Sequence, residues 1–351
     1  MKLAAIICEF NPLHTGHKKL IDYAKTVADK VVCIMSGNFT QRGLPACADK
    51  YSRATHAILA GADLVIELPT VFATASAENF AYGGVAIAEK LGADCLVFGS
   101  ECGNIDELKE CLNVIDNCET NKLIQQEVKK GVNYPKAVAV ATGLDVLEKP
   151  NNTLAIEYLK ALRNTHSNVT PFTLKREDNF NDSTPQQFAS SKALRDNAEL
   201  RSKYTYDYVT KDIDDTVVSK YYAIAPSIVA VATKEQLEQT EGVTEGLHNR
   251  IYNADKTKGY ERMIEEIKTK RYTRLKLQRI VLSCVLGITK QTVLLCKKQQ
   301  PSIKVLAVKA CETTLLQGIE NESDEITKRA DRLYATLSGK TVPTKLVKID
   351  C

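Results

Sequence analysis

Two histidines, His14 and His17, lie three residues apart where the chain turns from an apolar run into a helical pattern. On the first turn of a helix, this spacing places both imidazoles on one face. The start of a helix also offers unpaired backbone N–H groups and the positive end of the helix dipole, which favour an anion such as a phosphate. Gly16 lets a ligand approach the backbone closely. The turn therefore predicts a phosphate-binding site.

The chemistry that suits this pair is the stabilisation of charge on phosphoryl oxygens. Phosphoryl transfer is catalysed mainly by positioning and by electrostatic stabilisation. We therefore predict attack on the α-phosphorus of ATP, with pyrophosphate leaving and with His14 and His17 as the catalytic residues. The alternative is a pair of histidines that cap the helix or face solvent. The chain has five histidines and two of them fall in this turn, which favours the nucleotide-binding interpretation.

The elements around this turn alternate between short apolar runs and amphipathic patterns. Strands are predicted over 3–8, 31–35, 64–68, 95–98 and 169–174. Helices are predicted over 17–28, 51–60, 73–91, 154–162 and 190–197. Continuous apolar strands that alternate with helices indicate an α/β fold with a parallel sheet covered on both faces. Ligands of such sheets bind beyond the carboxyl ends of the strands, where the histidine turn lies.

The pattern becomes mainly helical from about residue 200, with helices predicted over 216–232, 259–268, 272–286, 302–318 and 324–337. We expect two domains, 1–200 and 201–351, because one core rarely grows past about 250–300 residues. Residues 1–200 hold 21 Lys or Arg and 24 Asp or Glu, whereas residues 201–351 hold 26 and 19, so the two parts carry −3 and +7. The basic second part indicates a polyanionic partner.

Composition and targeting signals favour a protein that stays in the cytoplasm. Glu9 interrupts the apolar run at the N-terminus, so a buried strand fits this segment better than a signal peptide. No stretch reaches the roughly 18–20 apolar residues that a membrane span needs. The eleven cysteines include no C-x-x-C pair, which favours buried, reduced thiols over zinc ligands. We expect no metal site in the protein, no membrane contact and no protein partner.

A second candidate phosphate site lies in the segment SSKALR at 190–195. Hydroxyls at a helix N-terminus, with two basic side chains nearby, can hold the β- and γ-phosphates of ATP. We assign Ser190, Lys192 and Arg195 to this site. The alternative is an ordinary helix cap with solvated basic residues, and Lys192 either serves a phosphate or points away.

The turn at 14–17 closely resembles the His-x-Gly-His signature of the nucleotidyltransferase superfamily, and 190–195 resembles its Ser-x-x-x-[Ile/Leu]-Arg element. Further segments resemble one family in particular, the bacterial tRNA(Met) cytidine acetate ligases. They are SGNFTQRGLP at 36–45, DKYSR at 49–53, GADLVIELP at 61–69, FGSE at 98–101, PNNTL at 150–154, EGLHNR at 245–250 and KRYTR at 270–274. Each segment alone is weak, but their number and order from residue 1 to about 285 make the resemblance specific.

This resemblance implies a Rossmann-like parallel-sheet nucleotidyltransferase domain followed by a mainly helical, basic, tRNA-binding domain. The enzyme would be an ATP-dependent ligase that makes acetyl-adenylate and pyrophosphate from acetate and ATP, with Mg²⁺ accompanying the ATP. It would then acetylate N4 of the wobble cytidine of elongator tRNA(Met), giving N4-acetylcytidine. The family's ATP-binding positions fall on Ile7, Cys8, Glu9, Phe10, Asn11, Pro12, Leu13, His14, Thr15, Gly16, His17, Lys18, Lys19, Leu20, Gly99, Asn152 and Arg176.

Three of these positions have a physical rationale of their own. Gly99 ends a strand, where a side chain would block the nucleotide. Asn152 offers a donor and an acceptor that suit an adenine edge or a ribose. Arg176 follows a strand and could bind a phosphate with its planar fork. The alternatives are a turn glycine, a helix cap and a surface arginine.

The stretch 250–279 is the most basic part of the chain, with ten Lys or Arg and four Asp or Glu. We predict RNA contacts from Lys270, Arg271, Arg274 and Arg279, with Tyr260 or Tyr272 available for stacking on a base. The alternative is a solvated helix. A second charged group, Asp49, Lys50 and Arg53, opens a predicted helix and either contacts phosphates or the RNA backbone or forms a solvated face.

Two other functions stay open on the sequence alone. A small-molecule adenylyltransferase of cofactor biosynthesis would use the same turn and retain AMP in its product, but it leaves the basic second part without a role. A non-catalytic RNA-binding protein with a vestigial nucleotide pocket is the other. The presence of His14, Gly16 and His17 together argues against it.

Overall fold

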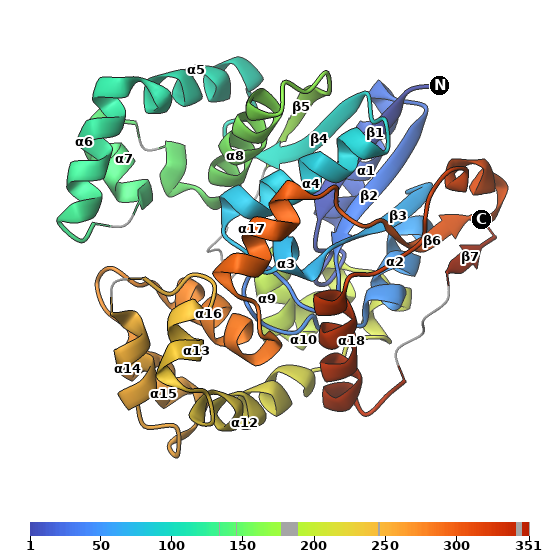
Figure 1. Ribbon diagram of the computed structural model, residues 1–351. Coiled ribbons are helices and arrows are strands. Elements are labelled where there is room, and N and C mark those ends of the chain that lie inside the picture. The colour runs from blue at the N-terminus through green and yellow to red at the C-terminus, as the bar shows by residue number, and fades with distance from the viewer. Residues whose placement is uncertain (133, 145, 177–188, 245, 342–345, 351) are drawn as a thin grey trace.

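The computed structural model describes residues 1–132, 134–144, 146–176, 189–244, 246–341 and 346–350 (Figure 1). Its centre is a seven-stranded sheet in the order β5-β4-β1-β2-β3-β6-β7. The strands are β1 (Leu3–Cys8), β2 (Lys30–Ser36), β3 (Leu64–Leu68), β4 (Cys95–Ser100), β5 (Thr170–Lys175), β6 (Lys304–Lys309) and β7 (Val347–Ile349). Strands β1 to β5 are parallel, β6 is antiparallel to β3, and β7 is parallel to β6. The five predicted strands and the α/β fold class are confirmed.

The strand order places the histidine turn at the switch point of the sheet. From β1 the chain moves outward through β2 and β3, and then returns to place β4 and β5 on the other side of β1. Ligands of doubly wound sheets bind in the crevice beyond the carboxyl ends of the two strands at which the order reverses. Here those strands are β1 and β4, which are followed by the histidine turn and by Glu101.

Helices cover both faces of the sheet, as the continuous apolar strands predict. Helices α1 (Thr15–Val27) and α2 (Lys50–Leu59) pack on one face, and α4 (Ala77–Lys90) and α8 (Pro150–Asn164) pack on the other. Strand β1 serves both layers, because Ala4 and Ile6 face the first pair of helices while Ala5 and Ile7 face the second. Alternate side chains of one strand therefore enter two different cores.

The helix predicted over 73–91 is divided in two. A short helix α3 (Thr70–Ala73) ends before residue 74, and Ser76 caps α4 by accepting from the Asn79 N–H. Gly83 and Gly84 lie within α4, where a Cβ would come within 2.4 Å of the Phe72 and Ile7 side chains respectively. The two glycines therefore allow α4 to lie close against β1 and α3, and this close packing offsets their low helix propensity.

Three helices on the outer side of α8 have no counterpart among the predicted elements. They are α5 (Ile105–Asp116), α6 (Cys118–Lys129) and α7 (Tyr134–Thr142), which form a group beside α8 in Figure 1. A 3-10 turn, η1 (Val146–Glu148), leads from them into α8. Asn104 and Asn117 cap α5 and α6 with their side-chain oxygens, and acidic residues follow each cap. These asparagines are the signals that could have located the helices.

The second part of the chain is mainly helical, as predicted. Helices α9 (Ser191–Asp196) and α10 (Ala198–Tyr204) lead into it. Its own helices are α11 (Asp207–Thr210), α12 (Val217–Ala230), α13 (Lys234–Gln239), α14 (Leu247–Asn253), α15 (Gly259–Ile267), α16 (Arg274–Leu286), α17 (Lys290–Lys298) and α18 (Glu325–Ser338). No helix in the described ranges combines the length and the apolar character that crossing a bilayer requires.

The helix predicted over 302–318 is wrong. This segment forms strand β6 and a 3-10 segment, η2 (Ala310–Leu316). Val305 and Val308 enter one core while Leu306 and Ala307 enter the other, so the strand is buried on both faces beside β3. A short apolar run buried on both sides does not alternate, and periodicity alone cannot distinguish it from a buried helix. The chain therefore returns to the sheet of the first part after residue 300.

Helix α18 is fixed to the sheet by a buried ion-pair network. The Lys50 Nζ lies 2.8 and 2.7 Å from the two carboxylate oxygens of Glu67 and 2.6 Å from Asp331 Oδ2. The Asn38 side-chain amide donates to the other Asp331 oxygen at 2.9 Å. Lys50 and Glu67 are each 1% exposed. Lys50 therefore does not form a solvated face, so that interpretation is wrong; its contact with a phosphate or with RNA stays a prediction.

Replacing Lys50 should destabilise the protein strongly. Lys50→Met leaves the Glu67 carboxylate buried without its cation, and breaking a buried pair in this way costs about 3–5 kcal/mol. Urea unfolding followed by circular dichroism measures the loss. Lys328→Met is the matched control, because Lys328 forms an exposed pair with Glu325 on α18, and its unfolding midpoint should not move. Equal midpoints for the two variants would contradict the account of the network.

Candidate functional site

The histidine turn runs from Glu9, which follows the end of β1 at Cys8, to His17 in the first turn of α1. His14 caps the helix, because its Nδ1 accepts from the Gly16 N–H at 3.1 Å. Its backbone carbonyl accepts from the N–H groups of His17 and Lys18 at 2.9 and 3.1 Å. Since Nδ1 is an acceptor, the neutral ring carries its proton on Nε2. The Nε2–H is then the group that His14 can offer to a ligand.

Hydrogen bonds from distant segments hold this turn in place. Its carbonyls accept from Arg53 Nη1 (Glu9 O, 2.6 Å), Arg195 Nη1 (Asn11 O), Ser191 Oγ (Pro12 O, 3.2 Å) and Thr205 Oγ1 (Leu13 O, 2.8 Å). Its side chains accept from the backbone N–H groups of Gln41 (Glu9 Oε1, 2.7 Å) and Cys47 (Asn11 Oδ1, 2.8 Å). The Asn11–Pro12 peptide bond is cis, and Phe10 has a φ of 45°. A positive φ at a phenylalanine persists only where the surroundings fix it, as these bonds do.

The two imidazoles stack on each other, with ring centroids 3.7 Å apart and an interplanar angle of 27°. Burial, with the nearby charges of Arg176 and Arg195, lowers the pKa of His14 to about 3. Burial, with His14 and Arg176 beside it, also holds the pKa of His17 well below its ordinary value. Both rings are therefore neutral near pH 7, so they can donate hydrogen bonds but carry no charge of their own.

Two buried polar atoms next to His14 have no partner. They are His17 Nδ1 and Thr15 Oγ1, which make no hydrogen bond to any described residue. Buried polar atoms of folded proteins are nearly always hydrogen-bonded. Both atoms belong to the first turn of α1, where unpaired backbone N–H groups already favour an anion. This is the position at which we expect a ligand to supply the missing bonds.

The side chains of the predicted ATP-binding segment 7–20 do not all face this position. Several of them belong to the two cores of the sheet, namely Ile7, Phe10, Leu13 and, partly buried, Cys8 and Leu20. Lys18 pairs with Asp22 one turn along α1 at 2.5 Å, and Lys19 is exposed. Any contact between the core residues and ATP would therefore come from backbone atoms.

Gly99 and Arg176 lie beside each other at the carboxyl edge of the sheet. A Cβ on Gly99 would come 3.2 Å from Arg176 Cγ, and the Arg176 N–H donates to the Ser100 carbonyl at 2.8 Å. The absence of a side chain at Gly99 thus leaves room for the aliphatic part of Arg176. From the sequence we expected this space to be left for the nucleotide. The charge of Arg176 reaches both histidines, since it contributes to lowering the pKa of each ring.

Asn152 is buried at the start of α8 and is already engaged. Its Oδ1 accepts from the N–H groups of Glu101 and Cys102 at 2.9 and 3.2 Å. The Glu101 carboxylate in turn accepts from the backbone N–H groups of Asn151 and Asn152 at 3.2 and 2.7 Å. Asn152 therefore fixes the turn that follows β4. Its binding of adenine or ribose stays a prediction.

The segment 190–195 lies against the histidine turn, but its three candidate phosphate ligands have different surroundings. Ser190 caps α9 by accepting from the Ala193 N–H at 3.2 Å. Arg195 binds the Asn11 carbonyl, which places its charge near His14. Lys192 is exposed and pairs with Asp196 at 2.8 Å, so it points away from the turn. The contacts of Ser190, Lys192 and Arg195 with phosphates stay predictions.

Arg53, on α2, is completely buried and binds only backbone carbonyls. Its guanidinium donates to the carbonyls of Glu9, Ser36, Gly37 and Ala48. Asp49 caps α2 by accepting from the N–H groups of Tyr51 and Ser52 at 2.9 and 3.0 Å. Arg53 does not form a solvated face, so that interpretation is wrong, whereas its contact with a phosphate or with RNA stays a prediction. Arg53 instead fixes the carboxyl ends of β1 and β2.

The predicted RNA contacts differ in their surroundings. Lys270 is exposed and Arg271 is half-buried in the loop before α16. Arg274 pairs with Glu261 at 2.5 Å and with Glu265 at 3.6 Å, and Arg279 donates to the Gln41 carbonyl at 3.4 Å. The RNA-binding roles of these four residues stay predictions.

The aromatic residues proposed for base stacking are both buried. Tyr260 is 2% exposed and stacks on Tyr222 with ring centroids 4.3 Å apart. Tyr272 is 6% exposed, and its hydroxyl lies 3.2 Å from Thr244 Oγ1. Neither ring has a face open to a base, so this expectation is wrong.

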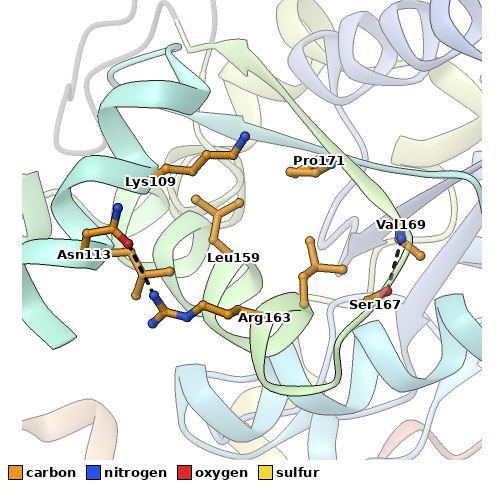
Figure 2. Close-up of a pocket in the computed structure, with 9 residues that line it drawn as sticks. Lys109, Asn113, Leu159, Arg163, Ser167, Val169 and Pro171 are labelled. Carbon is orange, nitrogen blue, oxygen red and sulfur yellow. Dashed lines mark hydrogen bonds between the residues drawn. The ribbon is translucent and has the colours of Figure 1, made fainter.

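A hollow of 340 Å³ lies between α5, α8 and the start of β5 (Figure 2). Leu112, Leu159, Leu162 and Val169 line its apolar part, and Lys109 and Arg163 stand at its rim. Arg163 is bound to Asn113 and Asp116. Strands β4 and β5 begin here, since Cys95 pairs with Thr170. The hollow therefore lies at the edge of the sheet opposite the histidine turn and contains no predicted catalytic side chain.

The described residues offer no set of ligands for a metal ion, because no three His, Cys, Asp or Glu side chains gather among them. Mg²⁺ prefers oxygen ligands and usually relies on substrate phosphates for several of them. The described residues therefore do not fit a resident Mg²⁺.

The His14→Gln variant should show a weaker loss of stability in acid. The folded-state pKa of His14 is about 3, below its ordinary 6.5, so the unfolded chain takes up the proton first and stability falls as the pH drops. Between about pH 7.5 and about pH 5 this histidine removes roughly 2 kcal/mol of unfolding free energy, which the variant does not lose. Urea unfolding at the two pH values measures the difference. If the unfolding free energies of wild type and His14→Gln changed equally with pH, a neutral His14 would be contradicted.

The chain matches known proteins over most of its length. The family model described as HIGH Nucleotidyl Transferase matches residues 1–344. A tRNA(Met) cytidine acetate ligase of Thermoanaerobacter sp. (strain X514) is 36% identical over 318 residues, which cover 83% of this chain and 79% of that protein. A tRNA(Met) cytidine acetate ligase of Caldicellulosiruptor saccharolyticus is 35% identical over 353 residues, which cover 93% and 87%.

The fold has a solved counterpart. The crystal structure of Thermotoga maritima TmcAL bound with alpha-thio ATP matches with a TM-score of 0.85 over 99% of this chain and 100% of that one, at 24% identity. At this identity the match confirms the fold, while the sequence matches above establish the family. The chain therefore belongs to the HIGH nucleotidyl transferase family and, within it, to the tRNA(Met) cytidine acetate ligases.

Proposed function

We propose that this protein activates acetate with ATP and transfers the acetyl group to N4 of the wobble cytidine of elongator tRNA(Met). Membership of the ligase family supports the overall reaction. The observation that carries it in this chain is the pair His14 and His17, two stacked and neutral rings at the switch point of the sheet. Six hydrogen bonds fix the turn that presents them.

In the first step, a carboxylate oxygen of acetate attacks the α-phosphorus of ATP. The bond from the α-phosphorus to the bridging oxygen breaks, and pyrophosphate leaves with that oxygen. Acetate is an anion at neutral pH, so the step needs no general base. Holding both reactants in line removes much of the entropic barrier. The product is acetyl-adenylate.

The histidines and the arginines would stabilise the transition state of this step in different ways. The Nε2–H of His14 and an N–H of His17 would donate to oxygens of the reacting phosphate, because neutral imidazoles remain hydrogen-bond donors. Arg176 and Arg195 would supply the positive charge, since both lie close enough to influence His14. Mg²⁺ would arrive already bound to the phosphates of ATP. Gly99 and Asn152 would shape the nucleotide side of the crevice.

In the second step, the N4 amine of cytidine attacks the carbonyl carbon of acetyl-adenylate. The bond from that carbon to the phosphate oxygen breaks, AMP leaves, and the nitrogen loses a proton. The base must leave its stack to reach the adenylate. The basic part 201–351 is the proposed tRNA-binding domain, and Lys270 is the exposed candidate among the four predicted. Because tRNA and ATP are its substrates, we place the reaction in the cytoplasm.

The alternative function, a small-molecule adenylyltransferase, is not favoured. Curated relatives that cover 83% and 93% of this chain carry the ligase name. The net charge of +7 on residues 201–351 also suits a polyanionic acceptor better than a small cofactor precursor.

Labelled acetate should enter tRNA only when the histidine turn is intact. The purified protein is incubated with ATP, radiolabelled acetate and unmodified elongator tRNA(Met), and the nucleosides are separated. We expect labelled N4-acetylcytidine, and a loss of roughly a hundredfold or more in His14→Ala and His17→Ala, because each removes a donor to the transition state. His166→Asn is the matched control, since His166 is exposed and has a φ of 52°, which asparagine tolerates.

The same incubation separates the competing functions. AMP joined to a small molecule, without labelled tRNA, would identify the adenylyltransferase. Tight tRNA binding without pyrophosphate release would identify a non-catalytic RNA-binding protein. Full activity of both alanine variants would contradict the central role of the turn.

A further inference from the structure

A loop over residues 37–45 lies between the histidine turn and helix α16. Gln41 in this loop is bound on two sides. Its backbone N–H donates to Glu9 Oε1 at 2.7 Å, and its carbonyl accepts from Arg279 Nη1 at 3.4 Å. Glu9 belongs to the histidine turn and Arg279 to α16. One residue thus connects the nucleotide side of the molecule with the basic helical part.

The loop lies directly on the backbone of α16. Gly43 has a φ of +73°, and a Cβ on it would come 2.5 Å from the Arg279 nitrogen and 2.6 Å from the Gln278 carbonyl carbon. No side chain fits at this position, because backbone atoms cannot move aside as a flexible side chain does. The contact between loop and helix therefore depends on the glycine.

The loop is also closed and anchored from within. Thr40 and Leu44 are joined by a backbone hydrogen bond at 3.1 Å, and Phe39 and Pro45 form an antiparallel bridge. The ring of Phe39 is buried and packs edge-on against Tyr221 and Tyr334. A loop held in this way moves as one unit, so a displacement at Arg279 would reach Gln41 and then Glu9.

Arg279 is poorly placed for a phosphate of RNA. Burial lowers the pKa of its guanidinium, whereas Lys270 in the same basic stretch is exposed. The backbone of Glu9 is also held in place, since its carbonyl accepts from Arg53 Nη1 at 2.6 Å. The side chain of Glu9 is therefore the link through which the loop can adjust the histidine turn.

We propose that Arg279 is a positioning residue for the adenylation step. It holds the loop 37–45 on α16, and Gln41 of that loop holds Glu9 and so orients the histidine turn. This inference rests on the proposed function, and it reassigns Arg279 from RNA contact to the support of the ATP site.

The test measures adenylation and RNA binding separately in Arg279→Met. Acetate-dependent exchange of pyrophosphate into ATP, without tRNA, reports adenylation. We expect its kcat to fall by roughly tenfold or more, because small misplacements of reacting groups cost that much. The affinity for tRNA and its salt dependence should stay at the wild-type level. Arg262→Met is the matched control, because Arg262 is exposed on α15 and pairs with Glu266; it should match wild type in exchange.

Two further variants distinguish positioning from a general loss of structure. Arg279→Lys keeps a donor near the Gln41 carbonyl and should recover part of the lost kcat. Gly43→Ala pushes the loop away from the backbone of α16 but keeps the Arg279 side chain, and it should reproduce the fall in exchange. The opposite pattern in Arg279→Met would overturn the proposal. In that case pyrophosphate exchange would be unchanged, tRNA binding would be weaker, and the slope of log affinity for tRNA against log salt concentration would fall by about one, as expected for a lost phosphate contact.

If the wild-type protein makes no adenylate, the proposed function is rejected. The positioning role of Arg279 can still be tested in that case, by hydrogen–deuterium exchange. In Arg279→Met, peptides that cover residues 9–14 and 38–44 should exchange faster than in wild type, because Gln41 loses one of its two anchors. Peptides from α5 serve as the internal control. Wild-type exchange rates in both peptides would overturn the proposal.

Discussion

The backbone carbonyls of residues 9, 11, 12 and 13 all accept hydrogen bonds from side chains that are far away in the sequence, and the site depends on this constraint. At the carboxyl edge of a parallel sheet such carbonyls would otherwise face an anionic ligand. Arg53 removes the conflict, because its buried guanidinium also binds the carbonyls that end β2. The turn can then present N–H groups and imidazoles to a phosphate.

This constraint also explains the charge state of the site. The packing of the turn buries His14 and partly buries His17, so burial, together with nearby cationic arginines, holds both rings neutral. Because the rings are neutral, the histidines would orient phosphate oxygens through hydrogen bonds, and the arginines would supply the positive charge. A neutral pair leaves the site without a proton to lose near pH 7, which suits a reaction whose nucleophile is already an anion.

The sequence predicted the strands and the histidine turn because both are local patterns: continuous apolar runs, and two histidines at the start of a helix. It did not predict the roles of Lys50 and Arg53, because their partners, such as Asp331 and the Gly37 carbonyl, are brought together only by folding. Strand β6 was missed for a related reason, since its apolar run becomes recognisable as a strand only beside β3. Local periodicity also could not reveal that Tyr260 and Tyr272 are buried.

The histidine turn is proposed to direct an acetate oxygen to the α-phosphorus of ATP. The most direct test incubates the protein with ATP, tRNA and acetate labelled with ¹⁸O in both oxygens, followed by mass spectrometry of the released nucleotide and phosphates. We expect one ¹⁸O atom in AMP, because the anhydride oxygen stays on phosphorus when the acetyl group moves to nitrogen. Label in pyrophosphate or in inorganic phosphate, with unlabelled nucleotide, would place the attack at another phosphorus and contradict the account.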